Sequence, residues 1–214
     1  GVGILLGKGQ VHQLCERRSV DVFRRLGAHG VGGAGMLVAS SAFVAVAVRS
    51  LGRERSLLAL LLCVGLVLCW VGDVIGYQGR FVPSAASFLL AHLFFAAGFM
   101  AAGLSWHRLG LAMGAMAISS SLLAVWFLPH VPSGQKLLIL GYIAVISLMV
   151  ATAWSAAHPN TRILAAAACL FYVSDIAVAY WKFVPDSGNC ALLCYPLYYP
   201  ACMLLALGSR LRPN

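Results

Sequence analysis

The stretch SLLALLLCVGLVLCWVGDVIG, residues 56–76, decides the fold class of this protein. It contains a single charged residue, Asp73, and is apolar around its whole circumference when read as a helix. A helix rises 1.5 Å per residue, so this stretch is long enough to cross the roughly 30 Å hydrocarbon core of a bilayer. We therefore expect a membrane-spanning helix here.

Further apolar runs of similar length lie on both sides of this stretch. Short connectors separate them, and these connectors hold most of the charged residues. The predicted spans are Val31 to Val48, Ser56 to Gly76, Phe81 to Trp106, Leu109 to Pro129, Leu137 to Ala157, Ile163 to Trp181 and Asn189 to Gly208. The sequence thus predicts an all-α fold, a polytopic transmembrane bundle of seven spanning helices that forms a single domain over residues 31–208.

The composition excludes two broad classes of protein. Apolar residues make up 61% of the 214 residues and charged residues 10%, whereas soluble domains have about 45–50% and about 25%. The net charge is +9, but the basic residues flank the apolar runs, as anchors near anionic lipid do. We expect membrane lipid as a partner and no nucleic acid, while the oligomeric state stays open.

The two ends of the chain are more polar than the runs. Residues 1–30 are too charged to span a membrane, and we expect them to lie at the interface or to be disordered. Residues 209–214 form a short basic tail. When residues 1–30 are left out, basic residues are fewer on the side that holds Arg80, Lys136 and Lys182, so the positive-inside rule predicts a cytoplasmic C-terminus.

A repeat relates the ends of the second and sixth runs. The copies read VGDVIGYQGRFVP at 71–83 and VSDIAVAYWKFVP at 173–185. In each copy a small residue precedes an Asp, a basic residue follows seven positions later, and Phe-Val-Pro comes next. Four helices separate the copies, so they run in the same direction as a parallel internal repeat. Each Asp is expected about 12 Å from a helix end marked by Phe-Val-Pro.

Asp73 and Asp175 are the acids that fall inside the predicted helices. A carboxylate in hydrocarbon costs at least a few kcal/mol, so such residues usually face a site or a proton relay. We expect the two carboxylates to share a polar cavity and one proton, which would make one an acid and the other a base. Alternatively, each Asp caps a kink or bonds a neighbouring helix.

Five other side chains are candidates for the same site. Arg80 and Lys182, seven residues after the acids, could hold a lipid phosphate or extend to the interface as anchors. His92 lies deep in a run and is either a third catalytic member or a hydrogen-bonded core residue. Tyr195 and Tyr198 share a helical face and either orient substrate or form an interfacial aromatic belt.

The sequence predicts neither a metal nor an organic cofactor. The histidines other than His92 fall at run ends or in connectors, which argues against a three-histidine metal centre. Patterns for a serine nucleophile elbow, a phosphate-binding glycine loop or a zinc hydrolase are absent. Ser119, Ser120 and Ser121 are predicted to make contacts between helices.

Four short motifs together resemble the lysoplasmalogenase family, the YhhN-like multi-pass membrane proteins. They are Val71-Gly72-Asp73-Val74, SFLLAHLF at 87–94, Tyr172-Val173-Ser174-Asp175 and Tyr198-Tyr199. The resemblance runs from about Ser56 to Leu207. It implies hydrolysis of the vinyl ether bond of a lysophospholipid substrate, with Asp73 and Asp175 as the catalytic pair. It also adds Tyr172 and Tyr199 to the candidate substrate-binding residues.

The implied chemistry agrees with the prediction that one of the two carboxyl groups is an acid and the other a base. A neutral Asp would donate a proton to the alkene carbon, and an ionised Asp would stabilise the cation and take a proton from water. The products would be a fatty aldehyde and glycerophosphoethanolamine or glycerophosphocholine. The family usually has an extra first helix, and we expect residues 1–30 to be too charged to form it. Cys202 and Ser147 stand where the family often has Gln and Asn. A different ether or ester substrate, a proton- or cation-coupled transporter and a non-catalytic lipid-binding protein remain alternatives.

Overall fold

A computed structural model describes residues 31–184 and 191–210 and confirms the predicted helical membrane bundle. The helices are α2 (Val31–Glu54), α3 (Leu57–Tyr77), α4 (Phe81–Ala101), α5 (Trp106–Phe127), α6 (Lys136–Ser155), α7 (Thr161–Phe183) and α8 (Ala191–Gly208). Two short 3-10 helices, η1 (Leu128–His130) and η2 (Ser133–Gln135), connect α5 to α6. The predictions for residues 1–30, and for the tail from residue 211 on, lie outside the described residues.

Six of these helices, α2 to α7, are long and apolar enough to cross a membrane, and α8 adds a shorter apolar helix over Leu193–Gly208. Large apolar side chains such as Leu111, Leu122 and Val125 point outward, which suits a surface in contact with lipid rather than water. The protein is a multi-pass membrane protein.

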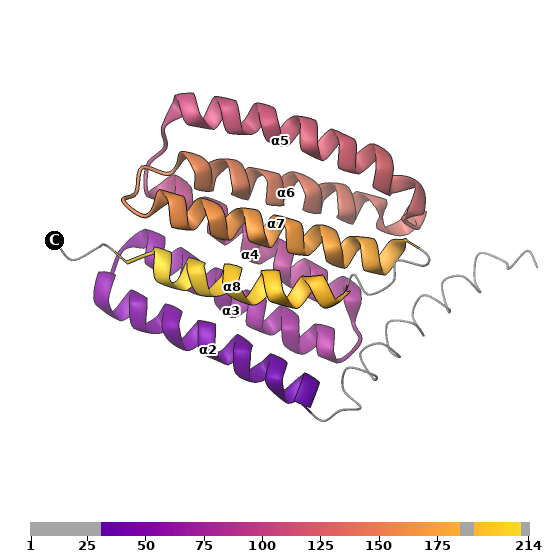
Figure 1. The fold of residues 1–214 in the computed structure, drawn as a ribbon, viewed down its shortest axis with the longest axis horizontal. Helices are drawn as coiled ribbons and strands as arrows, with labels where there is room; N and C mark the ends of the chain where they lie inside the picture. The colour runs from indigo at the N-terminus through magenta and orange to yellow at the C-terminus, as the bar shows by residue number, and fades with distance from the viewer. Residues whose placement is uncertain (1–30, 185–190, 211–214) are drawn as a thin grey trace, which may run out of the picture.

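Six of the helices form a closed ring. Around it α2 packs on α3, α3 on α4, α4 on α6, α6 on α7, α7 on α8, and α8 returns to α2. Consecutive helices run in opposite directions, so α3 and α7 run the same way (Figure 1). Asp73 on α3 and Asp175 on α7 both face the inside of this ring.

Helix α5 lies outside this ring, mainly against α6, and forms one edge of the bundle (Figure 1). Phe127, at its end, is the one buried residue of α5. The α4–α5 and α6–α7 connectors hold one another through hydrogen bonds from Ser105 N to Ser155 O and from Ala157 N to Gly103 O, each 2.8 Å. Helix α5 is thus fixed to the ring at its start.

Two helix boundaries differ from the sequence prediction. Helix α2 continues past Val48 to Glu54, because its last turns can extend charged side chains to the interface. Helix α4 ends at Ala101 rather than Trp106, since Gly103 takes a φ of 85° that favours glycine and turns the chain.

Glycines let α3 and α4 approach closely. A Cβ on Gly65 would lie 2.3 Å from the ring of Phe95, and one on Gly72 would lie 2.8 Å from the ring of Phe88. Small residues at such positions are the usual means of close packing between membrane helices. The approach lets Ser84 Oγ donate to Gly72 O at 2.8 Å, which fixes α4 beside Asp73.

The two copies of the repeat end differently. Helix α7 runs through to Phe183, as expected, but α3 already ends at Tyr77. Asp73 is therefore about 6 Å, not about 12 Å, from its helix end. The reason is Gly79, which adopts a φ of 78° and turns the chain so that Phe81 begins α4.

Candidate active site

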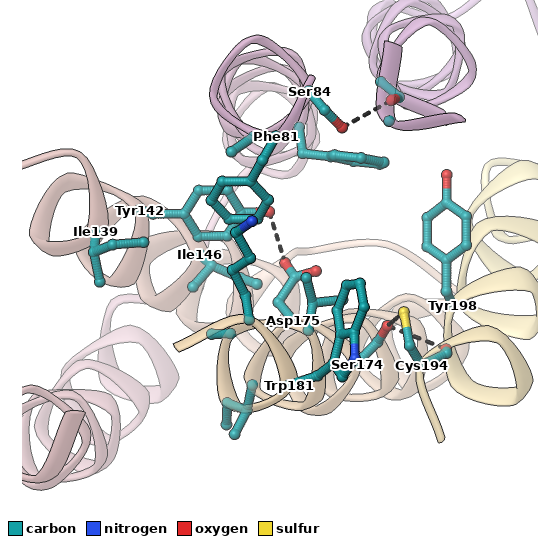
Figure 2. A pocket seen from close by; sticks show the side chains of 18 of the residues that line it. Phe81, Ser84, Ile139, Tyr142, Ile146, Ser174, Asp175, Trp181, Cys194 and Tyr198 are labelled. Atoms are coloured by element: carbon teal, nitrogen blue, oxygen red, sulfur yellow. Dashed lines mark hydrogen bonds between the residues drawn. The ribbon is translucent and has the colours of Figure 1, made fainter. Parts of the chain in front are cut away.

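A cavity of about 200 Å³ lies inside the ring, and both acids of the repeat line it. Its wall is mostly apolar and is contributed by every helix from α2 to α8. Figure 2 shows Asp175 at its centre, facing Tyr142 from α6, with Ser174, Cys194 and Tyr198 on the neighbouring side. The tertiary structure thus brings together two carboxyl groups that lie far apart in the sequence.

Asp73 is held by donors from two other helices. The hydroxyl of Tyr198 on α8 donates to Asp73 Oδ2 at 2.9 Å, and Ser40 Oγ on α2 donates to the same oxygen. Phe88 packs against the glycine face of α3 and meets the Tyr198 ring edge to face at 5.8 Å. Gly72 therefore serves the site indirectly, since it makes room for the ring that positions Tyr198.

Asp175 is held from the opposite side of the ring. The hydroxyl of Tyr142 donates to Asp175 Oδ2 at 3.0 Å (Figure 2). His92 Nε2 on α4 lies 3.4 Å from the same oxygen. The imidazole is fully buried, with its ring edge to face with Phe95, Tyr142 and Phe171. His92 is thus beside Asp175 but behind the cavity wall, where it can act only through Asp175.

The basic residues of the repeat lie in different places. Lys182 lines the cavity, and its Nζ lies 4.9 Å from the centre of the Phe81 ring. Arg80 is exposed and does not line the cavity. Phe81 and Phe183, which correspond in the two copies, meet edge to face at 5.7 Å. The two copies of the repeat therefore meet beside Lys182, at the end of the cavity farthest from the α6–α7 connector.

Three of the four candidate tyrosines line the cavity, and one does not. Tyr172, Tyr195 and Tyr198 line the cavity. The Tyr172 hydroxyl lies 3.0 Å from Ser119 Oγ on α5. Tyr199 lies outside the lining, where its hydroxyl donates to Met36 O at 3.4 Å and its ring stacks on Tyr195. Tyr199 therefore supports the wall rather than forming its surface.

Sequence reasoning missed three residues of the site. Ser40 and Tyr142 donate to the acids, and Trp126 forms part of the wall. Tyr142 had a usable signal, because a hydroxyl in the middle of an apolar run needs a partner. Ser40 had only the weak signal of a small polar residue in a predicted span. Nothing in the sequence pointed to Trp126.

The arrangement suits an amphiphilic ligand. One ammonium group lies at one end of the cavity, two carboxyl groups lie in its interior, and apolar side chains form most of the wall. Within residues 31–184 and 191–210, no three His, Cys, Asp or Glu side chains gather as a metal site would require. The two carboxyl groups that line the cavity are suited to proton transfer.

Comparisons with known proteins agree with this picture. The family model described as the YhhN family matches residues 34–209. Lysoplasmalogenases of Mycobacterium bovis and Mycobacterium tuberculosis are each 30% identical to the chain over 163 residues, which cover 74% of the chain and 62% of the relative. The chain thus spans less than two thirds of the length of these curated relatives.

No solved structure matches the chain. The family match covers nearly all the described residues, including both acids, His92, Lys182 and the tyrosines of the cavity. The resemblance found in the short motifs is confirmed, and the chain belongs to the YhhN family.

Proposed function

We propose that the protein is an intramembrane hydrolase that cleaves the vinyl ether bond of a lysoplasmalogen. The observation that carries the proposal is that Asp73 and Asp175 line one apolar cavity. Two relatives bear the name lysoplasmalogenase, and the substrate of such an enzyme is a single-chain lipid. A cavity within a membrane bundle, apolar with two acids, matches both the lipid and the acid-dependent chemistry of a vinyl ether.

The reaction needs one proton donor and one acceptor. A carboxylic acid donates a proton to the alkene carbon that does not bear oxygen, and the double bond becomes an oxocarbenium ion. Water attacks that ion, and the second carboxylate takes the proton that water releases. The resulting hemiacetal splits into a fatty aldehyde and the glycerol hydroxyl of the glycerophospholipid. As the hemiacetal splits, the carboxylate that gave the first proton takes the proton of the hemiacetal hydroxyl, and the other acid gives its proton to the departing glycerol oxygen. Both groups thus return to their starting protonation states.

The hydrogen bonds suggest how the two roles are divided. Asp73 accepts bonds from two hydroxyls on one oxygen, an arrangement that favours a carboxylate. Asp175 accepts one hydroxyl bond, from Tyr142. In this proposal Asp175 donates the proton to the alkene, and Asp73 stabilises the cation and then accepts a proton from water.

The position of Lys182 supports a phosphate-bearing substrate. Lys182 follows Asp175 by two helical turns, about 10 Å along α7, and lines the same cavity. A lysophospholipid has its phosphate separated from the ether oxygen by the glycerol carbons. With the phosphate near Lys182, the vinyl ether would reach the acids while the chain stays among apolar residues.

The direct test is release of aldehyde from a lysoplasmalogen by the purified protein in detergent. We expect release by the wild type, and none from the saturated ether lipid, which lacks the alkene that accepts the proton. Asp73→Asn and Asp175→Asn should each lower kcat by about 10²- to 10⁴-fold, the usual contribution of a general acid or base.

Folding must be checked in the same samples, by size-exclusion profile and thermal midpoint. Asn is nearly the shape of Asp, so both variants should remain monodisperse. Full activity in either variant would contradict the paired-acid mechanism. A folded wild-type protein that releases no aldehyde would contradict the assigned reaction, and proton-coupled uptake in sealed vesicles would then be the measurement to make.

The orientation in the membrane is a separate proposal. Arg49, Arg53, Arg108, Arg162 and Arg210 all lie at the end of the bundle where α8 finishes. The positive-inside rule places this end in the cytoplasm. The end of the cavity near Lys182 would then face the opposite side of the membrane. Labelling of a cysteine introduced at Arg162, in intact and permeabilised cells, tests this, because labelling in intact cells would contradict it.

A further inference from the structure

The end of α5 forms a side wall of the cavity, although α5 lies outside the helical ring. Leu123, Trp126 and Phe127 line the cavity together with residues of α6 and α7. Helices α6 and α7 are joined by a short connector at one end, and near their other ends they lie on either side of the cavity. The last turns of α5 cover the cavity between them.

This wall is thin. Trp126 lines the cavity, and 46% of its surface is accessible, counting the surfaces that face the cavity and the outside together. The adjacent residues Leu122 and Val125 point outward, with exposures of 67% and 77%. In a membrane their outer surfaces contact lipid. A single layer of side chains therefore separates the cavity from the surrounding hydrocarbon at this place.

The contacts that hold this part of α5 to α7 are mainly aromatic. The Trp126 ring stacks on Tyr180 of α7 at 5.5 Å, and Phe127 meets Phe183 edge to face at 5.6 Å. Two polar contacts lie deeper, Ser119 with Tyr172 at 3.0 Å and Ser120 with Ser147 at 2.6 Å. The predicted role of these two serines as contacts between helices is confirmed. At its end, α5 is also held by Phe127, which packs in an apolar cluster with Val131, Ile139 and Phe183.

The size of the cavity requires an opening for a lipid chain. Pockets that enclose drug-sized ligands have volumes of about 300–1,000 Å³, whereas this cavity has about 200 Å³. A lysophospholipid is larger than such ligands, so part of its chain must lie outside. Exposing the chain to water is unfavourable in proportion to the apolar surface exposed. The outer part of the chain must therefore lie in the hydrocarbon of the bilayer.

We infer that a single-chain lipid passes between the bilayer and the cavity through the α5 wall, and that Leu123 and Trp126 determine which chains fit. The acids and Lys182 hold the reactive end, and the chain leaves the cavity between the end of α5 and the facing Ile176 and Ala179 of α7. This inference builds on the proposed function, but it concerns the path of the chain and does not depend on hydrolysis.

The test uses a probe that cannot be hydrolysed. A saturated-ether lysophosphatidylcholine with a diazirine near the end of its chain is crosslinked to the full-length protein in nanodiscs, and the labelled peptides are identified by mass spectrometry. Because α5 faces lipid in any case, only labelling that is removed by excess unlabelled saturated-ether lysophosphatidylcholine is counted. We expect this competed labelling on the second half of α5 and on α7.

Substitutions in the wall provide the second part of the test. Leu123→Trp should fill the wall and lower the competed labelling by about tenfold, and Ile176→Trp should do so from the facing helix. Leu122→Trp is the matched control, since it adds the same side chain to the lipid-facing side and should leave the labelling unchanged.

Three outcomes would overturn the inference. They are competed labelling on α2 and α8, labelling in Leu123→Trp and Ile176→Trp equal to that of the wild type, and no competed labelling at all. Catalytic failure is distinguished from these outcomes, because a protein that releases no aldehyde but shows the expected labelling would lose the proposed reaction and keep the path of the chain.

Discussion

Asp73 and Asp175 hold the same position in the two copies of the repeat, and each accepts a hydrogen bond from a tyrosine of a different helix. Tyr198 donates to Asp73 Oδ2 at 2.9 Å, and Tyr142 donates to Asp175 Oδ2 at 3.0 Å. The sequence equivalence of the acids is therefore matched by a similar hydrogen-bonding environment. The donors themselves come from α8 and α6 and are not repeat partners.

The tyrosine donors are expected to position the acids. Tyr142→Phe and Tyr198→Phe keep the rings and their packing but remove the hydroxyls. A hydrogen bond to a charged group contributes about 1.5–3 kcal/mol, so loss of the bond to the Asp73 carboxylate in Tyr198→Phe should lower kcat by about tenfold or more. A bond between neutral groups contributes about 0.5–1.5 kcal/mol, so loss of the bond to the neutral Asp175 in Tyr142→Phe should have a smaller effect. The measurement is aldehyde release as a function of substrate concentration. Tyr180→Phe is the control, because this tyrosine of α7 does not line the cavity and the substitution keeps the ring that stacks on Trp126, so wild-type kinetics should be retained.

His92 is expected to act through Asp175, from which its Nε2 is 3.4 Å away. His92→Phe preserves an aromatic ring among Phe95, Tyr142 and Phe171. We expect kcat to fall by about tenfold with KM little changed, because the imidazole does not line the cavity. A thermal midpoint close to that of the wild type would show that packing is kept. Unchanged kcat in this variant would mean that His92 is a core residue only.

The two basic residues of the repeat are expected to differ in effect. Lys182 lines the cavity, whereas Arg80 is exposed outside it. Lys182→Gln should raise KM by about tenfold with a smaller effect on kcat, as expected when a contact to a non-reacting group of the substrate is lost. Arg80→Gln should leave both constants near the wild-type values. Equal increases of KM in the two variants would contradict the placement of the phosphate at Lys182.

Replacing a glycine by alanine is expected to lower stability only where two helices approach closely, as α3 and α4 do. Gly65→Ala places a Cβ 2.3 Å from the ring of the fully buried Phe95. Overpacking of this kind costs about 1–3 kcal/mol, so the thermal midpoint in detergent should fall. Gly110→Ala on α5 meets nothing within 4 Å, and its higher helix propensity should raise or preserve the midpoint. A similar midpoint for both variants would contradict the close approach of α3 and α4.

The fold was largely predictable because hydrocarbon imposes one strong rule, that a spanning backbone must satisfy its hydrogen bonds within a helix. Each predicted span corresponds to a helix in the structure. Where a helix ends earlier than expected, at α4 before Gly103 and at α3 before Gly79, local backbone geometry sets the boundary. At these places the chain turns although its composition remains apolar.

The site could be predicted in part for a related reason. A carboxyl group inside an apolar run is costly enough to stand out in the sequence, so Asp73 and Asp175 were recognisable without a structure. Hydroxyl groups have a smaller cost, so the signal of Tyr142 was weaker than that of the acids and the signal of Ser40 was weaker still. The repeat also treated Arg80 and Lys182 as equivalent, but the early end of α3 at Tyr77 leaves Arg80 in the turn before α4 and out of the cavity.

The sequence by itself determined the membrane location, the helices and the two buried acids. Each of these follows from the free energy of transferring individual residues from water into hydrocarbon. Only the tertiary structure decided which helices are neighbours, since helix packing depends on the match between small and large side chains on facing helices. That packing puts α4 beside α6, excludes α5 from the ring and places both acids on one cavity. The cavity and its thin wall at Trp126 are consequences of contacts between residues far apart in the chain.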